Sequence, residues 1–514
     1  MLLSRRSLLR SSAFGALAVP TIAACSAAPA APALIRDRPV LTHGAAVGDV
    51  RADGALIWAR ADRPAKLVVE TAATEAFADA RRFEGATVTP DADGTGRLRV
   101  VGLPPGQLVH YRVTAEGDGG ATSEPVTGVF RTAPTTASDV TLLWSGDVAG
   151  QGYGRNPDLG GMKIFSTMAA RDPHLFLHSG DSIYADGPVK ESVELDDGRI
   201  WRNVVTEAKS AVAQTLEQFR GQYSYNLEDE NYRRFNASVA QIVQWDDHET
   251  TNNWYSGGTV ADGKGYTERS MDVLSGRAFQ AFHEWMPLDI KEAVDGRVHR
   301  KISYGPLLDV FVLDMRTYKD ANGANTAPNG VIFGPAQTQW LIDGLRQSTA
   351  TWKIVANDLP LGVVVPDGTA AFEGPANGNP GAPSGRETEI ATVLSAIKAN
   401  RVRGVVWLTA DVHYTAAHRY SPERAAFTDF DEFWEFVSGP LNAGAFGPNK
   451  LDATFGPEAV FVHAPPADQQ NSSPLDGYQH FGEVRIDGRS RELTVNLCDA
   501  TGAVLFTQKL APPI

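Results

Sequence analysis

Charged side chains follow directly after a series of short apolar segments in the long C-terminal part of this sequence of 514 residues. The segments are residues 140–145, 175–178, 240–245, 308–313, 352–356 and 405–409. The charged residues that follow them are Asp147, Asp181, Asp247 with His248, Asp314 with Arg316, Asp358, and Asp411 with His413. Carboxylates brought together in such numbers would repel one another unless cations neutralised them. The pattern therefore predicts a metal centre where these segments meet.

The apolar segments predict the strands that bring these residues together. Continuous apolar runs of this length, each followed by a loop and a helical stretch, are typical of strands buried on both faces of an α/β sheet. Ligands of open α/β sheets bind outside the carboxyl ends of the strands. Asp411 and His413 also lie on the same side of an extended segment, as two metal ligands must. Near the end of the chain, residues 483–488 and 492–497 predict a hairpin, and residues 504–509 predict a last strand.

The ligand types restrict the metals. Carboxylate, phenolate and imidazole groups form a hard ligand set, which favours iron(III), calcium, manganese or magnesium over copper(I). Cys25 and Cys498 are the only cysteines in the sequence, so we expect neither a cysteine-based zinc site nor an intramolecular disulfide. Two metals bridged by a carboxylate would polarise a phosphoryl oxygen and supply a hydroxide at neutral pH.

Several of these motifs also have a purely structural interpretation. Residues 246–249 could form the N-terminus of a helix, where acidic side chains suit the helix dipole. Arg316 could simply pair with one of the acids, and His178, inside a predicted strand, fits a buried core histidine. The occurrence of all the motifs in chain order, each at the end of a strand, favours the functional interpretation.

A different pattern covers the first part of the chain. Short alternating segments such as residues 55–60 and 110–114 are separated by turn residues. About 100 residues of this kind predict a β-sandwich of the immunoglobulin or fibronectin type. We place this domain at residues 31–134 and the catalytic domain at residues 138–514.

The first 30 residues have the features of an export signal. Arg5 and Arg6 precede an apolar stretch, residues 13–22, that is too short to cross a bilayer. The adjacent arginines resemble a twin-arginine signal, and Cys25 lies in a sequence that resembles a lipoprotein box. Simple cleavage near this position is the alternative to lipidation. We expect residues 1–30 to be a signal peptide read by the twin-arginine export machinery, and the mature protein to be periplasmic or on the cell surface, with or without a lipid anchor at Cys25.

The charge balance limits the partners. The formal net charge of −14 argues against a nucleic-acid-binding surface, which needs basic residues. A small anionic substrate is not excluded, because metal ions held by aspartates make a pocket locally positive. No segment after the N-terminal one has about 18 consecutive apolar residues, so we expect no transmembrane helix. The oligomeric state is left open.

Three motifs resemble those of the PhoD-type alkaline phosphatases and phosphodiesterases, relatives of the calcineurin-like metallophosphoesterases and purple acid phosphatases. They are Gly-Asp-Ser-Ile-Tyr-Ala-Asp at residues 180–186, Trp-Asp-Asp-His-Glu at residues 245–249 with Asn-Asn-Trp at residues 252–254, and Ala-Asp-Val-His at residues 410–413. Residues 41–49 and 57–60 resemble the N-terminal signature of the family. The resemblance implies an N-terminal all-β immunoglobulin- or fibronectin-like sandwich, followed by a C-terminal α/β metallophosphoesterase domain built as an αββα sandwich.

The resemblance also implies a dinuclear or multinuclear metal site. The implied ligands are Asp147, Asp181, Tyr184, Asp247, Asn253, Asp411 and His413. Asp181 would bridge two metals, with Tyr184 and His413 on the iron(III) side and Asp411 on the calcium side. A trivalent iron can hold a phenolate well below its free pKa of about 10. Iron(III) and calcium are therefore favoured, with zinc, manganese and magnesium as alternatives.

Two further residues are implied to be catalytic. His248 takes the place of a histidine that contacts the phosphate and the leaving group, and Arg316 would clamp the phosphate through its planar guanidinium. Asp247 stands where the wider superfamily has a metal-binding asparagine, and Asn252 or Asn253 would complete the ligands of the second metal.

This sequence departs from the family pattern at two positions. Some relatives carry an iron-binding cysteine where this chain has Asp147. Purple acid phosphatases have an aspartate at this position, and the difference leaves the identity of the metals open. Asp358 stands where purple acid phosphatases use a histidine, and its role is also open.

The function predicted from these features is metal-dependent hydrolysis of phosphate esters by an exported enzyme similar to alkaline phosphatase D. One alternative is a phosphodiesterase or phospholipase-D-like activity on bulky diesters, which would use the same residues. Another is an envelope protein that binds a partner without catalysis. Residues 187–236 and the loop at residues 373–386 are predicted to shape the choice of substrate.

Overall fold

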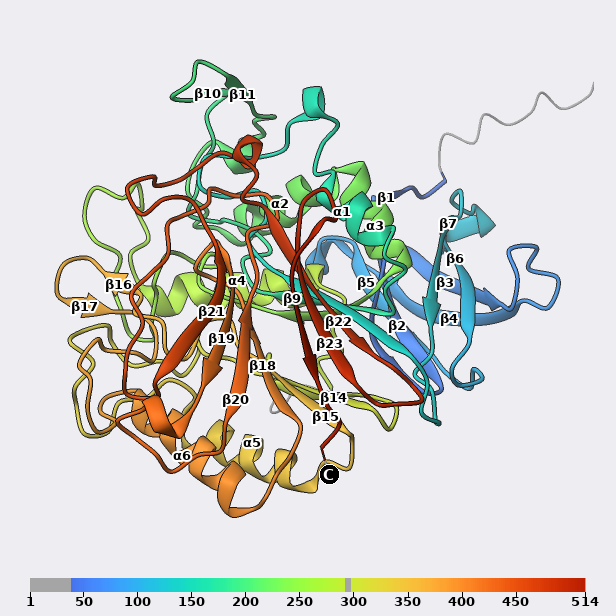
Figure 1. Ribbon diagram of the computed structural model, residues 1–514. Coiled ribbons are helices and arrows are strands. Elements are labelled where there is room, and N and C mark those ends of the chain that lie inside the picture. The colour runs from blue at the N-terminus through green and yellow to red at the C-terminus, as the bar shows by residue number, and fades with distance from the viewer. Residues whose placement is uncertain (1–37, 292–296, 514) are drawn as a thin grey trace, which may run out of the picture. The chain divides into compact units, whose positions relative to one another are not determined.

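The computed structural model describes residues 38–291 and 297–513 (Figure 1). The predicted signal peptide and the predicted lipidation site Cys25 lie outside these residues. Within the described part of the chain, no helix is long and apolar enough to cross a membrane.

The larger of two central sheets carries the first strands predicted to end at the site. Its strand order is β24-β23-β22-β8-β9-β12-β1-β2-β5. The strands are β1 (Leu41–Arg51), β2 (Gly54–Ala61), β5 (Thr95–Val100), β8 (Val140–Ser145), β9 (Leu175–Ser179), β12 (Ala240–Gln244), β22 (His480–Ile486), β23 (Leu493–Asp499) and β24 (Val504–Leu510). Because β8, β9 and β12 run parallel, the residues that follow them reach the same edge of the sheet. The predicted hairpin is confirmed as the antiparallel pair β22 and β23.

The smaller sheet carries the remaining predicted strands. Its order is β13-β14-β15-β18-β20-β19-β21. The strands are β13 (Arg300–Tyr304), β14 (Leu308–Val312), β15 (Trp352–Ala356), β18 (Val405–Thr409), β19 (Thr415–Tyr420), β20 (Phe433–Val437) and β21 (Pro457–His463). The central strands β14, β15, β18 and β20 are parallel, so their carboxyl ends also share one edge.

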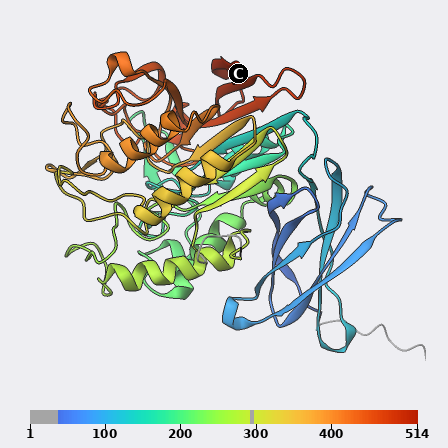
Figure 2. The same ribbon diagram turned by 90° about the horizontal axis from the view of Figure 1, so that it is seen from below.

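Helices cover the outer faces of the two sheets, while their inner faces share one apolar core (Figures 1 and 2). Leu142 of β8 and Val310 of β14 belong to this shared core. The neighbouring residues point outward: Leu143 packs in the cluster of the first helices, and Phe311 packs against the last two. The helices are α1 (Ile164–Ala169), α2 (Leu216–Leu227), α3 (Glu230–Ser238), α4 (Met271–Trp285), α5 (Pro335–Gln347) and α6 (Glu387–Ala399). Burial on both strand faces explains the continuous apolar runs, and the expected αββα sandwich is confirmed.

The N-terminal strands form a second β-structure that is joined to the larger sheet. A separate four-stranded sheet has the order β4-β3-β6-β7. Its strands are β3 (Ala65–Ala72), β4 (Arg81–Val88), β6 (Leu108–Glu116) and β7 (Val126–Arg131). The other N-terminal strands, β1, β2 and β5, belong to the larger sheet, because Gly48 of β1 pairs in parallel with Gln241 of β12. The all-β sandwich was expected, but the strand pattern does not predict this shared sheet.

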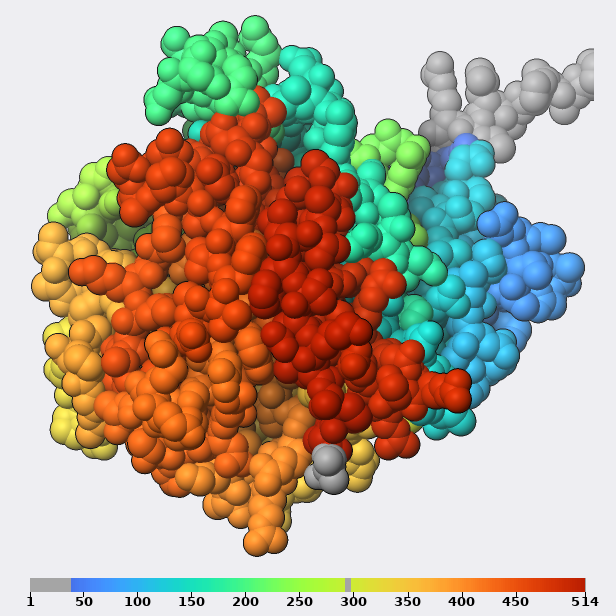
Figure 3. Space-filling model, in the orientation of Figure 1, coloured from blue at the N-terminus to red at the C-terminus, as the bar shows by residue number. Residues whose placement is uncertain are grey.

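The connections carry short hairpins. One consists of β10 (Ser192–Glu194) and β11 (Ile200–Arg202), within the segment predicted to shape substrate choice. In the space-filling view this part of the chain, coloured green, projects from the surface (Figure 3). The other hairpin consists of β16 (Pro366–Asp367) and β17 (Ala371–Phe372).

Glu387, in the first turn of α6, should make the stability of the fold depend on pH. Its side chain is buried, and burial raises the pKa of Glu387 to about 7 from its ordinary value of 4.5. The folded state therefore binds more protons than the unfolded state between these two values, and stability falls as the pH rises through this window. We expect Glu387→Gln to remove a loss on the order of 3 kcal/mol between pH 4.5 and 8, measured by urea unfolding at several pH values.

A matched control is Glu230→Gln in the first turn of α3, where the side chain is exposed. The control should unfold with the same pH dependence as the wild type. An unchanged pH dependence in Glu387→Gln would contradict the prediction.

Candidate metal centre

A cavity with a volume of about 530 Å³ lies where the predicted strand ends meet. The predicted site residues that line it are Asp181, Asp247, His248, Asn253, Asp411 and His413. They come from the turns after β9, β12 and β18, which belong to both sheets. The alternative of a helix N-terminus at residues 246–249 is wrong, because this segment forms a turn and the next helix, α4, begins at Met271.

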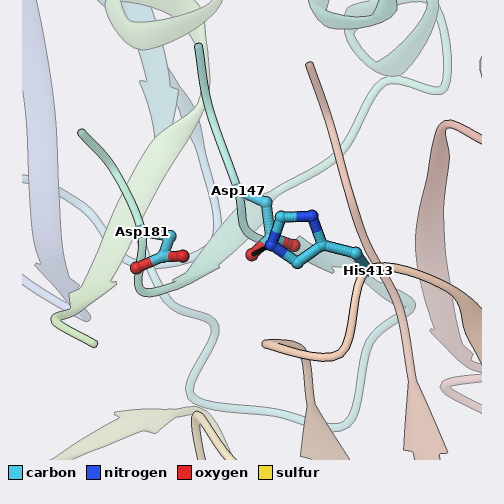
Figure 4. Close-up of side chains that lie close together, drawn as sticks. All are labelled: Asp147, Asp181 and His413. Atoms are coloured by element: carbon cyan, nitrogen blue, oxygen red, sulfur yellow. Dashed lines mark ion pairs between the residues drawn. The ribbon is translucent and has the colours of Figure 1, made fainter. Parts of the chain in front are cut away.

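Asp147, Asp181 and His413 form the first of three groups that could hold a metal ion. One ligand atom from each lies within 4.8 Å of the others, and all three residues are buried. Figure 4 shows the His413 ring directed toward the Asp147 carboxylate, with Asp181 beside it. The distance from His413 Nε2 to Asp147 Oδ1 is 3.4 Å. Neither carboxylate oxygen of Asp147 has a hydrogen-bond partner among the described residues, and a buried carboxylate left in this way suits a metal ligand.

Two more groups continue from the first. One consists of Asp181, Asp247 and His248, and the other of Asp246, Asp247 and Asp411. Asp181 is shared by the first two groups and Asp247 by the last two. The candidate ligands therefore form a continuous series from His413 to Asp411, with room for more than one ion.

The backbone at these positions is unusual. The φ angles are positive at Asp147 (68°), Asp181 (49°), Asn253 (59°), Asp411 (65°) and His413 (59°). Non-glycine residues adopt this left-handed region infrequently, and such conformations concentrate at functional sites. Sharp turns at the strand ends aim these side chains toward one another.

The carboxylates of the site are electrostatically costly without a cation. Burial raises the pKa of Asp147 to about 8, and it raises the pKa values of Asp181 and Asp411 well above their ordinary range. Burial also tends to raise the pKa of Asp247. The neighbouring cations His248 and Arg316 have the larger, opposite effect and hold that pKa at about 2. The neighbours of Asp181 and Asp147 include other carboxylates, which add to the effect of burial. Bound cations would relieve this repulsion.

Tyr184 and His413 are held next to each other. The Tyr184 hydroxyl lies 2.8 Å from His413 Nε2. Burial and the nearby Asp181 raise the pKa of the Tyr184 phenol well above its ordinary value. The other ring nitrogen of His413, Nδ1, makes a hydrogen bond with the carbonyl of Gly444, so Nε2 is left to face the carboxylates.

His248 is fixed by a carboxylate and an aromatic ring. Its Nδ1 lies 2.7 Å from Asp186 Oδ1, and its ring stacks on Tyr184 with a centroid distance of 4.2 Å. Burial alone would lower the pKa of His248, but Asp186, Asp247 and Asp181 raise it well above its ordinary value. These carboxylates favour the protonated form of the ring, which lines the cavity.

Arg316 does not line the cavity. Its side chain has no exposed surface, and it pairs with acids that surround it. These acids are Asp246, Asp358 (2.9 Å), Glu373 and Asp411 (3.1 Å). In this structure the Arg316 donors bind carboxylates, and the predicted clamp on the phosphate stays a prediction. The structural interpretation, pairing with the acids, describes the observed contacts.

Replacing Arg316 by methionine should unfold the protein more easily. The change leaves several buried carboxylates without their cation, which costs about 3–5 kcal/mol for a buried pair. The exposed Arg346→Met on α5 is the control, because the exposed Arg346–Asp343 pair contributes little. Urea unfolding without added metal measures both variants. A stable Arg316→Met protein with only a raised KM for phosphate esters would instead support the clamp.

Asn253 lies at the cavity wall but uses its side chain for another contact. Its Nδ2 donates to Asp367 Oδ1 at 3.1 Å, and Asn322 Nδ2 donates to the other oxygen of Asp367 at 2.8 Å. The side-chain oxygen of Asn253 is the atom left for a metal. His178 is buried among apolar residues and burial lowers its pKa to about 4, which matches a core histidine.

Several residues of the site were not singled out from the sequence. Asp186 holds His248, Glu373 pairs with Arg316, and Glu249 accepts hydrogen bonds from the backbone and side chain of Ser182, each at 2.6 Å. Asp186 and Glu249 lie inside the motifs at residues 180–186 and 245–249, so their positions in the sequence could have indicated that they belong to the site. Glu373 lies outside these motifs, at the first residue of the loop predicted to shape substrate choice, and no sequence pattern indicates its contact with Arg316.

Comparisons with known proteins find similar sequences and a similar fold. Residues 142–497 match the family model described as PhoD-like phosphatase, and residues 25–134 match the model of its N-terminal domain. Alkaline phosphatase D from Bacillus subtilis (strain 168) is 28% identical over 433 residues, covering 80% of this chain and 70% of that protein. A solved structure of PhoD has a TM-score of 0.66 at 21% identity and covers 92% of both chains.

A more distant likeness shows the same fold. Purple acid phosphatase PPD1 from yellow lupin (Lupinus luteus) has a TM-score of 0.56 at 12% identity, over 92% of this chain and 74% of that one. The resemblance stated from the sequence motifs is confirmed by these matches. Since the first family model alone spans more than half of the chain, this protein belongs to the PhoD-like phosphatase family and is a hydrolase of phosphoric esters.

Proposed function

We propose that this protein is an exported phosphatase that cleaves phosphate monoesters at a dinuclear centre of iron(III) and calcium. The observation that supports the centre most strongly is the buried Asp147 carboxylate, whose oxygens accept no hydrogen bond within the usual distance in the described part of the chain and lie beside another candidate ligand, His413. A hard set of oxygen and imidazole ligands around it fits metals of this type.

The residues divide into two sets of ligands. Asp147, Tyr184 and His413 would hold the iron, Asp247, Asn253 and Asp411 would hold the calcium, and Asp181 would serve both. Metals bound there polarise phosphoryl oxygens and lower the pKa of a coordinated water. Zinc, manganese or magnesium would supply the same chemistry.

The other residues handle protons and charge. His248 Nε2 faces the cavity and donates a proton to the leaving alkoxide, while Asp186 fixes the opposite ring nitrogen and keeps the ring protonated. Arg316 balances the negative charge of Asp246, Asp358 and Glu373, and its ion pair with Asp411 helps to hold that ligand in position.

Metal removal tests this proposal directly. We expect a chelator to abolish hydrolysis of glycerol phosphate and of a chromogenic monoester, and expect iron together with calcium to restore it. Elemental analysis should give both metals, and the visible phenolate band should disappear in Tyr184→Phe. A colourless protein with only zinc or manganese would remove iron from the proposal, and full activity in the metal-free protein would overturn it.

The ester class and the location need separate tests. A rate on bis-(4-nitrophenyl) phosphate above that on the 4-nitrophenyl monoester would favour the diesterase alternative. Export is proposed from the sequence of residues 1–30, and Arg5→Lys with Arg6→Lys should hold the protein in the cytoplasm. Secretion of that double variant at the normal level would contradict twin-arginine export.

A further inference from the structure

A second cavity opens beside the metal centre. It has a volume of about 350 Å³, and Asn252, Asn253 and Asp367 line both cavities. Ligand pockets of proteins measure about 300–1,000 Å³, so this side pocket is large enough for part of a small-molecule substrate. The two cavities are therefore neighbours that share part of their walls.

One part of the side-pocket wall is apolar and aromatic, and the rest is polar. Trp254, Tyr255 and Tyr266 line it together with Val260 and Met271. Trp254, Val260 and Met271 are buried, and the two tyrosines are half-buried. Flat aromatic side chains in such a compartment favour the binding of another planar ring, because stacking buries apolar surface at little entropic cost.

One side of Trp254 is already packed. Its ring meets that of Trp245 edge to face, with a centroid distance of 5.6 Å and an angle of 74°. Trp245 in turn donates from Nε1 to Asp314 at 3.0 Å. This wall is therefore held in place by the core next to β12, and it does not need the ligand to form.

The polar residues of the side pocket are held in fixed orientations. Asp367 accepts from Asn253 at one oxygen and from Asn322 at the other. Lys264 lines the side pocket as an exposed cation. A ligand with a ring and polar groups at its edge fits this combination better than a plain hydrocarbon does.

The position of Asp186 indicates which part of the substrate enters the side pocket. Asp186 lines this pocket and holds Nδ1 of His248, whose ring lines the first cavity. In the proposed function, His248 protonates the leaving oxygen. The alcohol attached to that oxygen therefore extends past His248 toward the side pocket.

We propose that the side pocket binds the alcohol part of the substrate and selects alcohols that carry a planar ring, as nucleotides do. This inference rests on the proposed function, since it uses the phosphate position and the role of His248. It adds a substrate class to that function. Tyr255 and Tyr266 are the specificity residues, and neither lines the first cavity or belongs to one of the three ligand groups.

The test compares two monoesters that both release an alkyl alcohol, adenosine 5′-monophosphate and glycerol 3-phosphate. The metal-loaded wild type should have the higher kcat/KM with the nucleotide. Tyr266→Ala and Tyr255→Ala should each lower kcat/KM for the nucleotide about tenfold, the size of one lost stacking contact, and change that for glycerol phosphate less than about twofold. Tyr266→Leu keeps most of the side-chain volume but cannot stack, so it distinguishes the loss of stacking from misfolding of Tyr266→Ala. Tyr478→Ala, half-buried and outside both cavities, is the control.

The outcomes separate the two proposals. Equal losses on both esters, or no loss on either, would overturn the side-pocket assignment while the hydrolysis of glycerol phosphate upholds the proposed function. Hydrolysis of neither ester would overturn the proposed function. In that case calorimetry with adenosine still decides the pocket: binding by the wild type that is lost in Tyr266→Leu supports it, and absence of binding overturns it.

Discussion

Asp181→Asn should lose nearly all phosphatase activity, with kcat/KM falling more than about 100-fold. Replacing residues that merely support a metal ligand costs about 10–100-fold, and Asp181 takes part in two of the three ligand groups. Asparagine keeps the size of the side chain and tolerates the positive φ of 49° at this position, so the fold should survive. The measurements are kcat/KM and metal content by elemental analysis.

The control for this variant is Asp158→Asn. Asp158 is exposed and lies in no ligand group, so its replacement should leave metal content and rate unchanged. If Asp181→Asn retained both metals and the wild-type rate, Asp181 would not be the shared ligand.

His248→Ala should show the second large effect, and the size of that effect should depend on the leaving group. General acid catalysis contributes about 10²–10⁴-fold, so we expect a loss in this range for glycerol phosphate. The 4-nitrophenyl ester should lose far less, because 4-nitrophenolate leaves without a proton. The ratio of kcat values for the two esters measures the proton transfer separately from metal binding.

The carboxylate behind His248 should shift the pH profile. Asp186 raises the pKa of His248, so Asp186→Asn should lower that pKa. The acid form, and with it the rate on glycerol phosphate, should then be lost at a lower pH than in the wild type. His110→Ala, in β6 of the N-terminal sandwich, is the control. An unchanged profile in Asp186→Asn, or equal losses on both esters in His248→Ala, would contradict the role of His248.

Much of the fold could be predicted because its strands are buried on both faces. Continuous apolar runs then mark the strands, and the parallel arrangement places the residues after them at one edge. This is why Asp147, Asp181 and His413, although far apart in the sequence, could be expected at one site. Parallel strands place Asp147 and Asp181 at one edge of the larger sheet, and the packing of the two sheets brings His413, which follows β18 of the smaller sheet, to the same site.

What could not be predicted depends on contacts between distant loops. Glu373 reaches Arg316 from a loop, and together with Asp246, Asp358 and Asp411 it surrounds the buried guanidinium in a way that no local pattern encodes. The pairing of β1 with β12 depends on how two domains meet, and no local pattern encodes it. The φ angles at the strand ends are likewise set by the assembled sheets rather than by residue type.

The parallel pairing of β1 with β12 gives the N-terminal sandwich a protective task. Without β1, the backbone of β12 would be exposed at a sheet border, and unpaired strand borders recruit other chains and cause aggregation. The buried Asp49–Arg300 ion pair, at 2.9 Å, reinforces this junction. A shortened protein that begins at residue 138 would therefore lose solubility although it keeps every predicted metal ligand, and we expect the two regions to fold as one unit.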